Sequence, residues 1–176
     1  MIKIAAWIQA IYVTIMTWLI GRLLEAASIA DKKIQSELIG LPESFVFSMG
    51  SLPDGPKFVM QRKDDNTLRC LKKKDTTTAD LVISFKHVKH AFLVFSFQEG
   101  TARSFANERI VLNGEINLAM IIVRCLDRME ALVLPRFIAV RALKRYPSIR
   151  LSEKLFLALK IYMQFLIGLF RRRRHA

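Results

Sequence analysis

The sequence predicts an α+β fold: a curved, mostly antiparallel sheet of five strands, covered on one face by helices and extended by apolar helices at both ends of the chain. Three observations predict it. Apolar and polar residues alternate in short stretches between residues 45 and 85, as in strands with one buried face. Residues 116–134 repeat apolar side chains every three or four positions, as in a helix with one buried stripe. Residues 4–20 and 155–170 are apolar runs with few charges.

Length and composition limit the class of protein. The chain has 176 residues, enough for one domain with terminal additions. We predict an apolar helical segment at 1–40, the sheet domain at 41–135 and basic amphipathic helices at 136–176. Hydrophobic residues make up 52% and the mean hydropathy is +0.26 although 24% of residues are charged, which indicates membrane contact. The net charge is +13, and residues 136–176 hold eleven Lys and Arg against Glu153 alone. Such a tail suits anionic headgroups, whereas binding to nucleic acid would leave its apolar residues unexplained.

The N-terminal run, residues 4–20, predicts a helix that contacts a membrane. Its seventeen residues rise about 25 Å, near the lower limit for crossing a bilayer. If it spans, Arg22, Lys32 and Lys33 outweigh Lys3 and place the domain in the cytoplasm. If it does not, it lies on the domain or in the membrane interface with Trp7 and Trp18 near the headgroups. No cleavable signal peptide is predicted, so we expect the cytoplasmic face of the inner membrane.

Four strands are predicted between Phe45 and Phe85, joined by turn-forming stretches at 52–56 and 64–66 and by a polar loop at 72–78. We expect them to form an antiparallel run, with a fifth strand at 109–112 that ends at the turn dipeptide Asn113-Gly114. Two helices, 87–97 and 116–134, should cover the apolar face of this sheet.

The C-terminal run, residues 155–170, has basic clusters on both sides. A spanning helix would leave one cluster on the wrong side of the membrane, so an interfacial helix is predicted. Its lipid-facing residues would be Leu155, Leu159, Tyr162, Leu166 and Phe170, with Arg171, Arg172, Arg173 and Arg174 on anionic headgroups.

No pattern indicates catalysis or a metal site. His87 and His90 share a helical face but have no carboxylate or Cys at ligand spacing. Cys70 and Cys125 each sit within an apolar pattern and are expected to be reduced core residues. A phosphate-binding glycine loop and a nucleophile elbow are both absent from the sequence. The chain is therefore predicted not to be an enzyme, with no cofactor unless a bound lipid or quinone serves as one.

Several of these features together resemble the sterol carrier protein type 2 family of lipid-binding domains. The resemblance rests on Ala79-Asp80 before the strand 81–85, on a Phe-containing turn before the strand 109–112, and on Gly114-Glu115-Ile116-Asn117-Leu118-Ala119. It covers roughly residues 40–145 and is nearest to the family's bacterial accessory factors of oxygen-independent ubiquinone biosynthesis. The apolar, basic tail after residue 145 is a departure from those factors.

The resemblance implies an apolar tunnel between sheet and helices that takes up a lipid, with an isoprenoid quinone or its precursor as the favoured cargo. Apart from the resemblance, an apolar sheet face under helices is equally an ordinary core. Methionine in such a wall tolerates ligands of irregular shape. The expected lining is Phe47, Met49, Phe58, Met60, Ile83, Phe85, Phe92, Leu118 and Ile122. A protein that presents such a lipid would work with a membrane-bound partner complex. The alternative is a non-catalytic structural subunit of a membrane complex, in which the same fold is filled by its own side chains.

Overall fold

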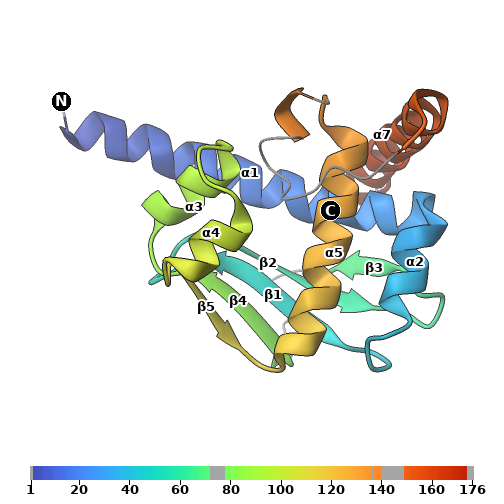
Figure 1. The fold of residues 1–176 in the computed structure, drawn as a ribbon, viewed down its shortest axis with the longest axis horizontal. Helices are drawn as coiled ribbons and strands as arrows, with labels where there is room; N and C mark the ends of the chain where they lie inside the picture. The colour runs from blue at the N-terminus through green and yellow to red at the C-terminus, as the bar shows by residue number, and fades with distance from the viewer. Residues whose placement is uncertain (1, 72–77, 136, 140–148, 174–176) are drawn as a thin grey trace.

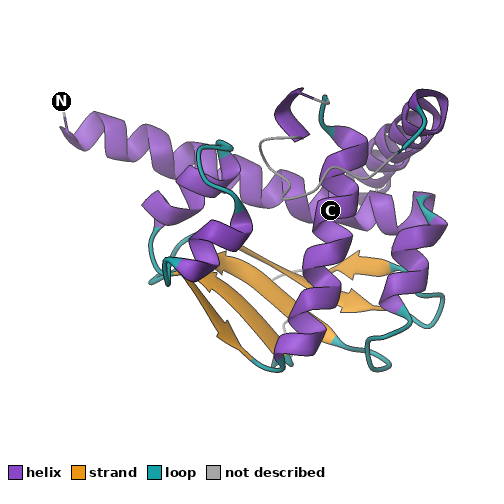
Figure 2. Ribbon diagram, in the orientation of Figure 1, coloured by secondary structure: helices purple, strands orange, loops and turns teal. Residues whose placement is uncertain are grey.

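The computed structural model describes residues 2–71, 78–135, 137–139 and 149–173. Five strands form one sheet and the helices gather on one side of it (Figures 1 and 2). The strands are β1 (Val46–Ser51), β2 (Lys57–Arg62), β3 (Leu68–Cys70), β4 (Leu81–Phe85) and β5 (Ile110–Asn113). The helices are α1 (Ile2–Ala30), α2 (Lys32–Leu38), α3 (Val88–Phe95), α4 (Thr101–Ala106), α5 (Ile116–Val133) and α7 (Leu151–Arg173). The predicted α+β fold with a five-stranded sheet is confirmed.

The sheet is mixed, in the order β3-β2-β1-β4-β5. β1 with β2, β2 with β3, and β4 with β5 are antiparallel, but β4 runs parallel to β1, with Phe47 opposite Leu81. The expected antiparallel run is therefore wrong for β4. Asp80 holds this register, because the Val46 N–H donates to Asp80 Oδ2 at 2.8 Å and the Asp80 N–H donates to the Val46 carbonyl at 2.8 Å.

The long helix α1 crosses the helical layer above the sheet (Figure 1). Its second half joins the same apolar core as the strands, and Leu24 and Ala27 are fully buried there. Gly21 allows a close approach, since a Cβ atom at this position would lie 3.0 Å from Phe58 Cγ. The predicted segment 1–40 thus contributes to the core of the sheet domain.

Polar side chains of α1 also cover the edge strand β3. The Leu68 N–H donates to Ser28 Oγ at 2.9 Å and the Cys70 N–H donates to Glu25 Oε1 at 3.2 Å. An uncovered edge strand presents free backbone groups to other chains. α1 therefore closes this edge as well as burying apolar surface. Among the described helices, the stretch Ala6–Ala30 is the one long and apolar enough to cross a membrane, but 56% of its apolar stretch of 18 residues is buried inside the fold.

Helices α2 and α5 are joined by two ion pairs. Arg128 Nε donates to Asp31 Oδ2 at 2.8 Å, with 13% and 5% of the two side chains exposed. Arg124 Nε donates to Glu37 Oε2 at 2.7 Å on the surface. At the start of α5 the chain turns at Gly114, whose φ of +127° suits glycine. The predicted turn and the long helix behind it are confirmed.

Candidate functional site

The predicted lipid-lining residues converge on one side of the sheet. The seven that are buried within the apolar core are Phe47, Met49, Phe58, Met60, Ile83, Phe85 and Ile122. Phe92 and Leu118 are half-buried and pack against that core. Phe92 turns toward α1, where its ring meets Tyr12 edge-on at 5.3 Å between centroids.

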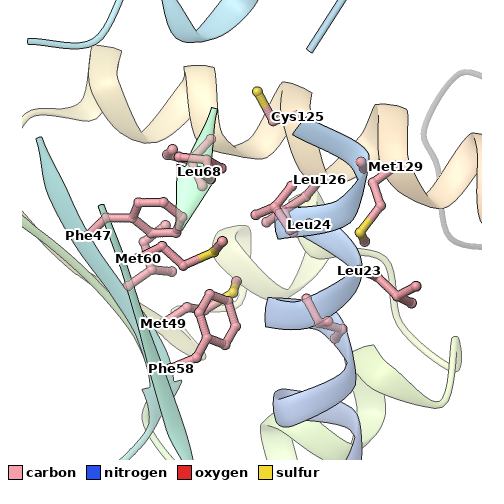
Figure 3. Close-up of a cluster of buried hydrophobic side chains, with 14 of the residues drawn as sticks. Leu23, Leu24, Phe47, Met49, Phe58, Met60, Leu68, Cys125, Leu126 and Met129 are labelled. Carbon is pink, nitrogen blue, oxygen red and sulfur yellow. The ribbon is translucent and has the colours of Figure 1, made fainter. Parts of the chain in front are cut away.

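Side chains from two helices lie against these residues. Figure 3 shows Leu24 of α1 and Leu126 of α5 facing the Phe- and Met-rich wall of the sheet, while Leu23 and Met129 lie on the other side of α1. Phe47 and Phe58 pack edge-to-face within that wall, with ring centroids 6.3 Å apart. The residues expected to line a tunnel therefore form a packed seam in this structure. The sequence left open whether the run 4–20 packs on the domain or contacts a membrane, and the helices predicted to cover the sheet were 87–97 and 116–134.

The predicted membrane-contacting residues are on the surface. Trp7 is 67% exposed, Leu155 62%, Leu159 61% and Phe170 67%, and Trp18, Tyr162 and Leu166 are exposed too. Residues 171–173 end α7, but their side chains, and Arg174 as a whole, lie outside the described residues.

The exposed apolar surface is wider than predicted. Sequence reasoning missed six further exposed residues, which are Ile8, Ile11 and Ile15 of α1 and Phe156, Met163 and Ile167 of α7. The signal was available for five of them, because each lies three, four or seven positions from a predicted residue on the same helix, and Ile8 follows Trp7 directly. Trp18 connects the two sets, since its ring meets Phe165 of α7 edge-on at 6.1 Å between centroids. We call the predicted and added residues of both helices, from Trp7 to Trp18 and from Leu155 to Phe170, the α1–α7 apolar face.

The polar residues that interrupt the α7 run bond to the rest of the fold. Lys154 Nζ donates to the Leu134 carbonyl at the end of α5 at 2.7 Å, and Lys160 Nζ donates to the Ala30 carbonyl at the end of α1 at 3.3 Å. The last carbonyls of a helix lack intrahelical partners and favour cations. Ile161, which follows Lys160 on the same helix, is fully buried. α7 is thus held against α1 and α5 by its lysines, and its outward side is apolar.

The two thiols in the core are held in their neutral forms, and one carboxyl group on α5 also has a raised pKa. Burial, followed by the charge of Glu25, raises the pKa of Cys70 to about 12, and burial, followed by Glu37, raises the pKa of Cys125 to about 12. Both are inert as nucleophiles at neutral pH. On α5, burial and then the neighbouring Asp127 raise the pKa of Glu130 to about 7. The described residues hold no group of three or more His, Cys, Asp or Glu that could bind a metal ion.

No family model and no curated protein matches the chain. Among solved structures, the chain is similar to a ubiquinone synthesis protein named UbiJ-SCP2, with 14% identity over 68% of this chain and 96% of that one and a TM-score of 0.44. It is also similar to sterol carrier protein 2 from Yarrowia lipolytica, with 12% identity over 64% and 91% of the two chains and a TM-score of 0.44. A third is sterol carrier protein domain 2 of Helicoverpa armigera, with 12% identity over 65% and 87% and a TM-score of 0.44.

The matched structures are sterol carrier protein domains, the family that the sequence resembles.

Proposed function

We propose that the protein is a non-catalytic, peripheral membrane protein that docks through the α1–α7 apolar face and holds or presents an apolar lipid. The cargo would sit between the sheet and the helices, at the Phe- and Met-rich seam. An isoprenoid quinone or its precursor is the favoured cargo because the sequence resemblance implies it. The protein would act at the cytoplasmic face of the inner membrane and pass the lipid to a membrane-bound complex.

The observation that carries the docking proposal is the division of α7 into a polar inner side and an apolar outer side. Lys154 and Lys160 donate inward to the carbonyl ends of α5 and α1, while Leu155, Leu159 and Phe170 point outward. Exposed apolar residues that gather on one side of a domain mark interaction sites. An amphipathic helix with basic residues at its end suits the lipid interface.

The cargo proposal rests on the composition of the seam. Met49 and Met60 contribute flexible side chains, which can repack around a guest of irregular shape. Each buried CH₂ group of a lipid chain contributes about 0.8 kcal/mol, so few polar contacts are needed. In this structure Leu24 fills the seam, and uptake requires α1 to shift from the sheet.

Vesicle flotation tests the docking step. We expect Leu159→Glu and Ile167→Glu to reduce the fraction of protein that floats with phosphatidylcholine vesicles, because each places a charge on the outer side of α7. Ile39→Glu is the matched control, because Ile39 is 62% exposed and Leu159 is 61% exposed. Ile39 lies at the C-cap of α2 and does not belong to the α1–α7 apolar face. Equal flotation of all three variants would contradict docking through α7.

A structural subunit of a membrane complex is the second candidate. The packed seam favours it, because Phe47 and Met60 are already fully buried by the protein's own side chains. In that case the α1–α7 apolar face would contact helices of partner subunits, and the purified chain would carry no lipid. Extraction of lipids from the purified protein separates the two candidates.

A further inference from the structure

Arg62 at the end of β2 is a buried cation without an anionic partner. Only 9% of the residue is exposed, and its Nε atom is buried and makes no hydrogen bond. Among the described residues, its side chain bonds only to Asn66 in the β2–β3 turn, where Nη2 donates to the neutral amide oxygen. Because a guanidinium group carries five N–H donors, most of its hydrogen-bonding capacity is left open.

Each half-buried arginine of the described residues has a carboxylate partner. These pairs are Arg22 with Glu25, Arg109 with Glu99 and Arg128 with Asp31. Arg62 is more buried than these three and forms no ion pair with any described residue. Arginine is almost never buried unless it is paired, because an unpaired charge away from water is costly. The Arg62 site therefore lacks an anion.

The position of Arg62 places this cation at one end of the Phe- and Met-rich seam. Phe58, Met60 and Arg62 alternate along β2 on the side that the helices cover, and all three are buried. In register, Arg62 lies opposite Leu68 of β3, and its N–H donates to the Phe45 carbonyl at 2.8 Å. Figure 3 shows Phe58, Met60 and Leu68 following one another along the wall. The neighbours of Arg62 on the sheet are thus apolar core residues, and the cation lies at the end of their row.

An apolar seam with an unpaired cation at its end offers both parts of a site for an amphiphile. We propose that Arg62 binds the anionic head group, a carboxylate or a phosphate, of a lipid whose chain lies in the seam. The planar fork of arginine matches both oxyanions with two parallel hydrogen bonds. Such bonds are stronger inside a protein than in water, because the local dielectric is lower.

This head-group site rests on the proposed function, since it needs a lipid chain in the seam. It also narrows the cargo. A neutral quinone would leave the charge of Arg62 without a counter-charge, whereas an acidic precursor would supply one. The site therefore favours an acidic precursor over the quinone itself.

Competition between lipids that share one chain tests the site on the full-length protein. Oleate, oleyl phosphate and oleyl alcohol differ in the head group. Pairs of them are offered at equal concentration to the protein in mild detergent at about pH 8, where a free carboxyl group is ionised. Native mass spectrometry then gives the ratio of the two bound species.

The main variant is Arg62→Met, which removes the charge at a similar side-chain volume. Arg62→Lys keeps the charge but lacks the planar fork. Arg69→Met is the matched control, because Arg69 is an exposed arginine on the adjacent strand β3 and lies between the buried Leu68 and Cys70, on the opposite face of the sheet.

We expect the wild-type protein to prefer at least one anion over oleyl alcohol by about tenfold, the effect of a hydrogen bond to a charged group. Arg62→Met should reduce this preference to less than about twofold, Arg62→Lys should be intermediate, and Arg69→Met should keep it. The anion that binds better identifies the head group as carboxylate or phosphate. The urea midpoint of Arg62→Met should be no lower than that of the wild type, because an apolar side chain replaces an unpaired buried charge.

Equal binding of all three lipids by the wild-type protein would overturn the head-group site and leave lipid carriage intact. A preference that Arg62→Met retains, or that Arg69→Met loses to the same extent, would overturn it too. Failure of the proposed function is a different result, namely a wild-type protein that binds none of the three lipids, and the head-group site fails with it.

Discussion

Replacing Leu24 by alanine tests whether α1 is a core helix of the domain. Leu24 is fully buried between α1 and the sheet, so the substitution leaves a cavity that its neighbours can close only in part. Such changes cost about 2–5 kcal/mol of unfolding free energy, and we expect about 3 kcal/mol here. For a domain of this size that loss corresponds to a fall in Tm of about 6–12 °C.

The matched control for Leu24→Ala is Ile15→Ala on the same helix. Ile15 is 57% exposed, so its loss should change the unfolding free energy by less than about 0.5 kcal/mol. Urea unfolding of the three proteins in one mild detergent, followed by circular dichroism, supplies the comparison. Equal stability of the two variants would refute the packing of α1 on the sheet and favour a membrane helix separate from the domain.

Three further predictions follow from the charges and thiols of the core. Arg128→Ala should cost about 3–5 kcal/mol in urea unfolding, because it leaves Asp31, 5% exposed, without its ion-pair partner, whereas Arg124→Ala at the exposed pair should cost less than about 1 kcal/mol. The folded-state pKa of Glu130 is raised to about 7, so its contribution to stability is present below about pH 4.5 and lost as pH rises through 7. Unfolding from pH 5 to 8 should therefore show a loss of roughly 2–3 kcal/mol that Glu130→Gln removes. The pKa of Cys70 is raised to about 12, so a thiol reagent at pH 8 should leave Cys70 unmodified until the protein is unfolded.

The strands and the long helix could be predicted from the sequence because their signals are local. The alternation around Phe47 and Phe58 marks one buried face, and Asn113-Gly114 marks the end of β5. The partner of β4 could not be predicted in this way. Its parallel place beside β1 depends on Asp80, whose hydrogen bonds to Val46 join residues 34 positions apart.

The role of α1 was ambiguous for a physical reason. A helix buried in a protein core and a helix buried in lipid both need a long apolar run. What distinguishes α1 is a stripe of small and polar residues, Gly21, Glu25 and Ser28, at helical spacing. They meet Phe58 and the β3 backbone, and such a stripe indicates contact with another part of the fold.

The candidate site was predictable in parts. The inward side chains of the sheet follow from alternation, and seven of the nine predicted lining residues are buried. Which helix lies over them depends on tertiary packing, and Leu24 was therefore missed. The inward use of Lys154 and Lys160 could not be foreseen either, because the carbonyls they bind belong to distant helices.

Native mass spectrometry of the detergent-purified protein, with identification of any lipid that dissociates, tests the central proposal most directly. We expect one apolar lipid species at a stoichiometric level, a prenylated quinone or its precursor. This lipid should be absent from the Met60→Trp variant, because the larger side chain takes up the space in the seam. Circular dichroism shows whether the variant is folded. A protein without lipid, or with bulk phospholipids in varying amounts, would contradict lipid carriage and favour the structural subunit.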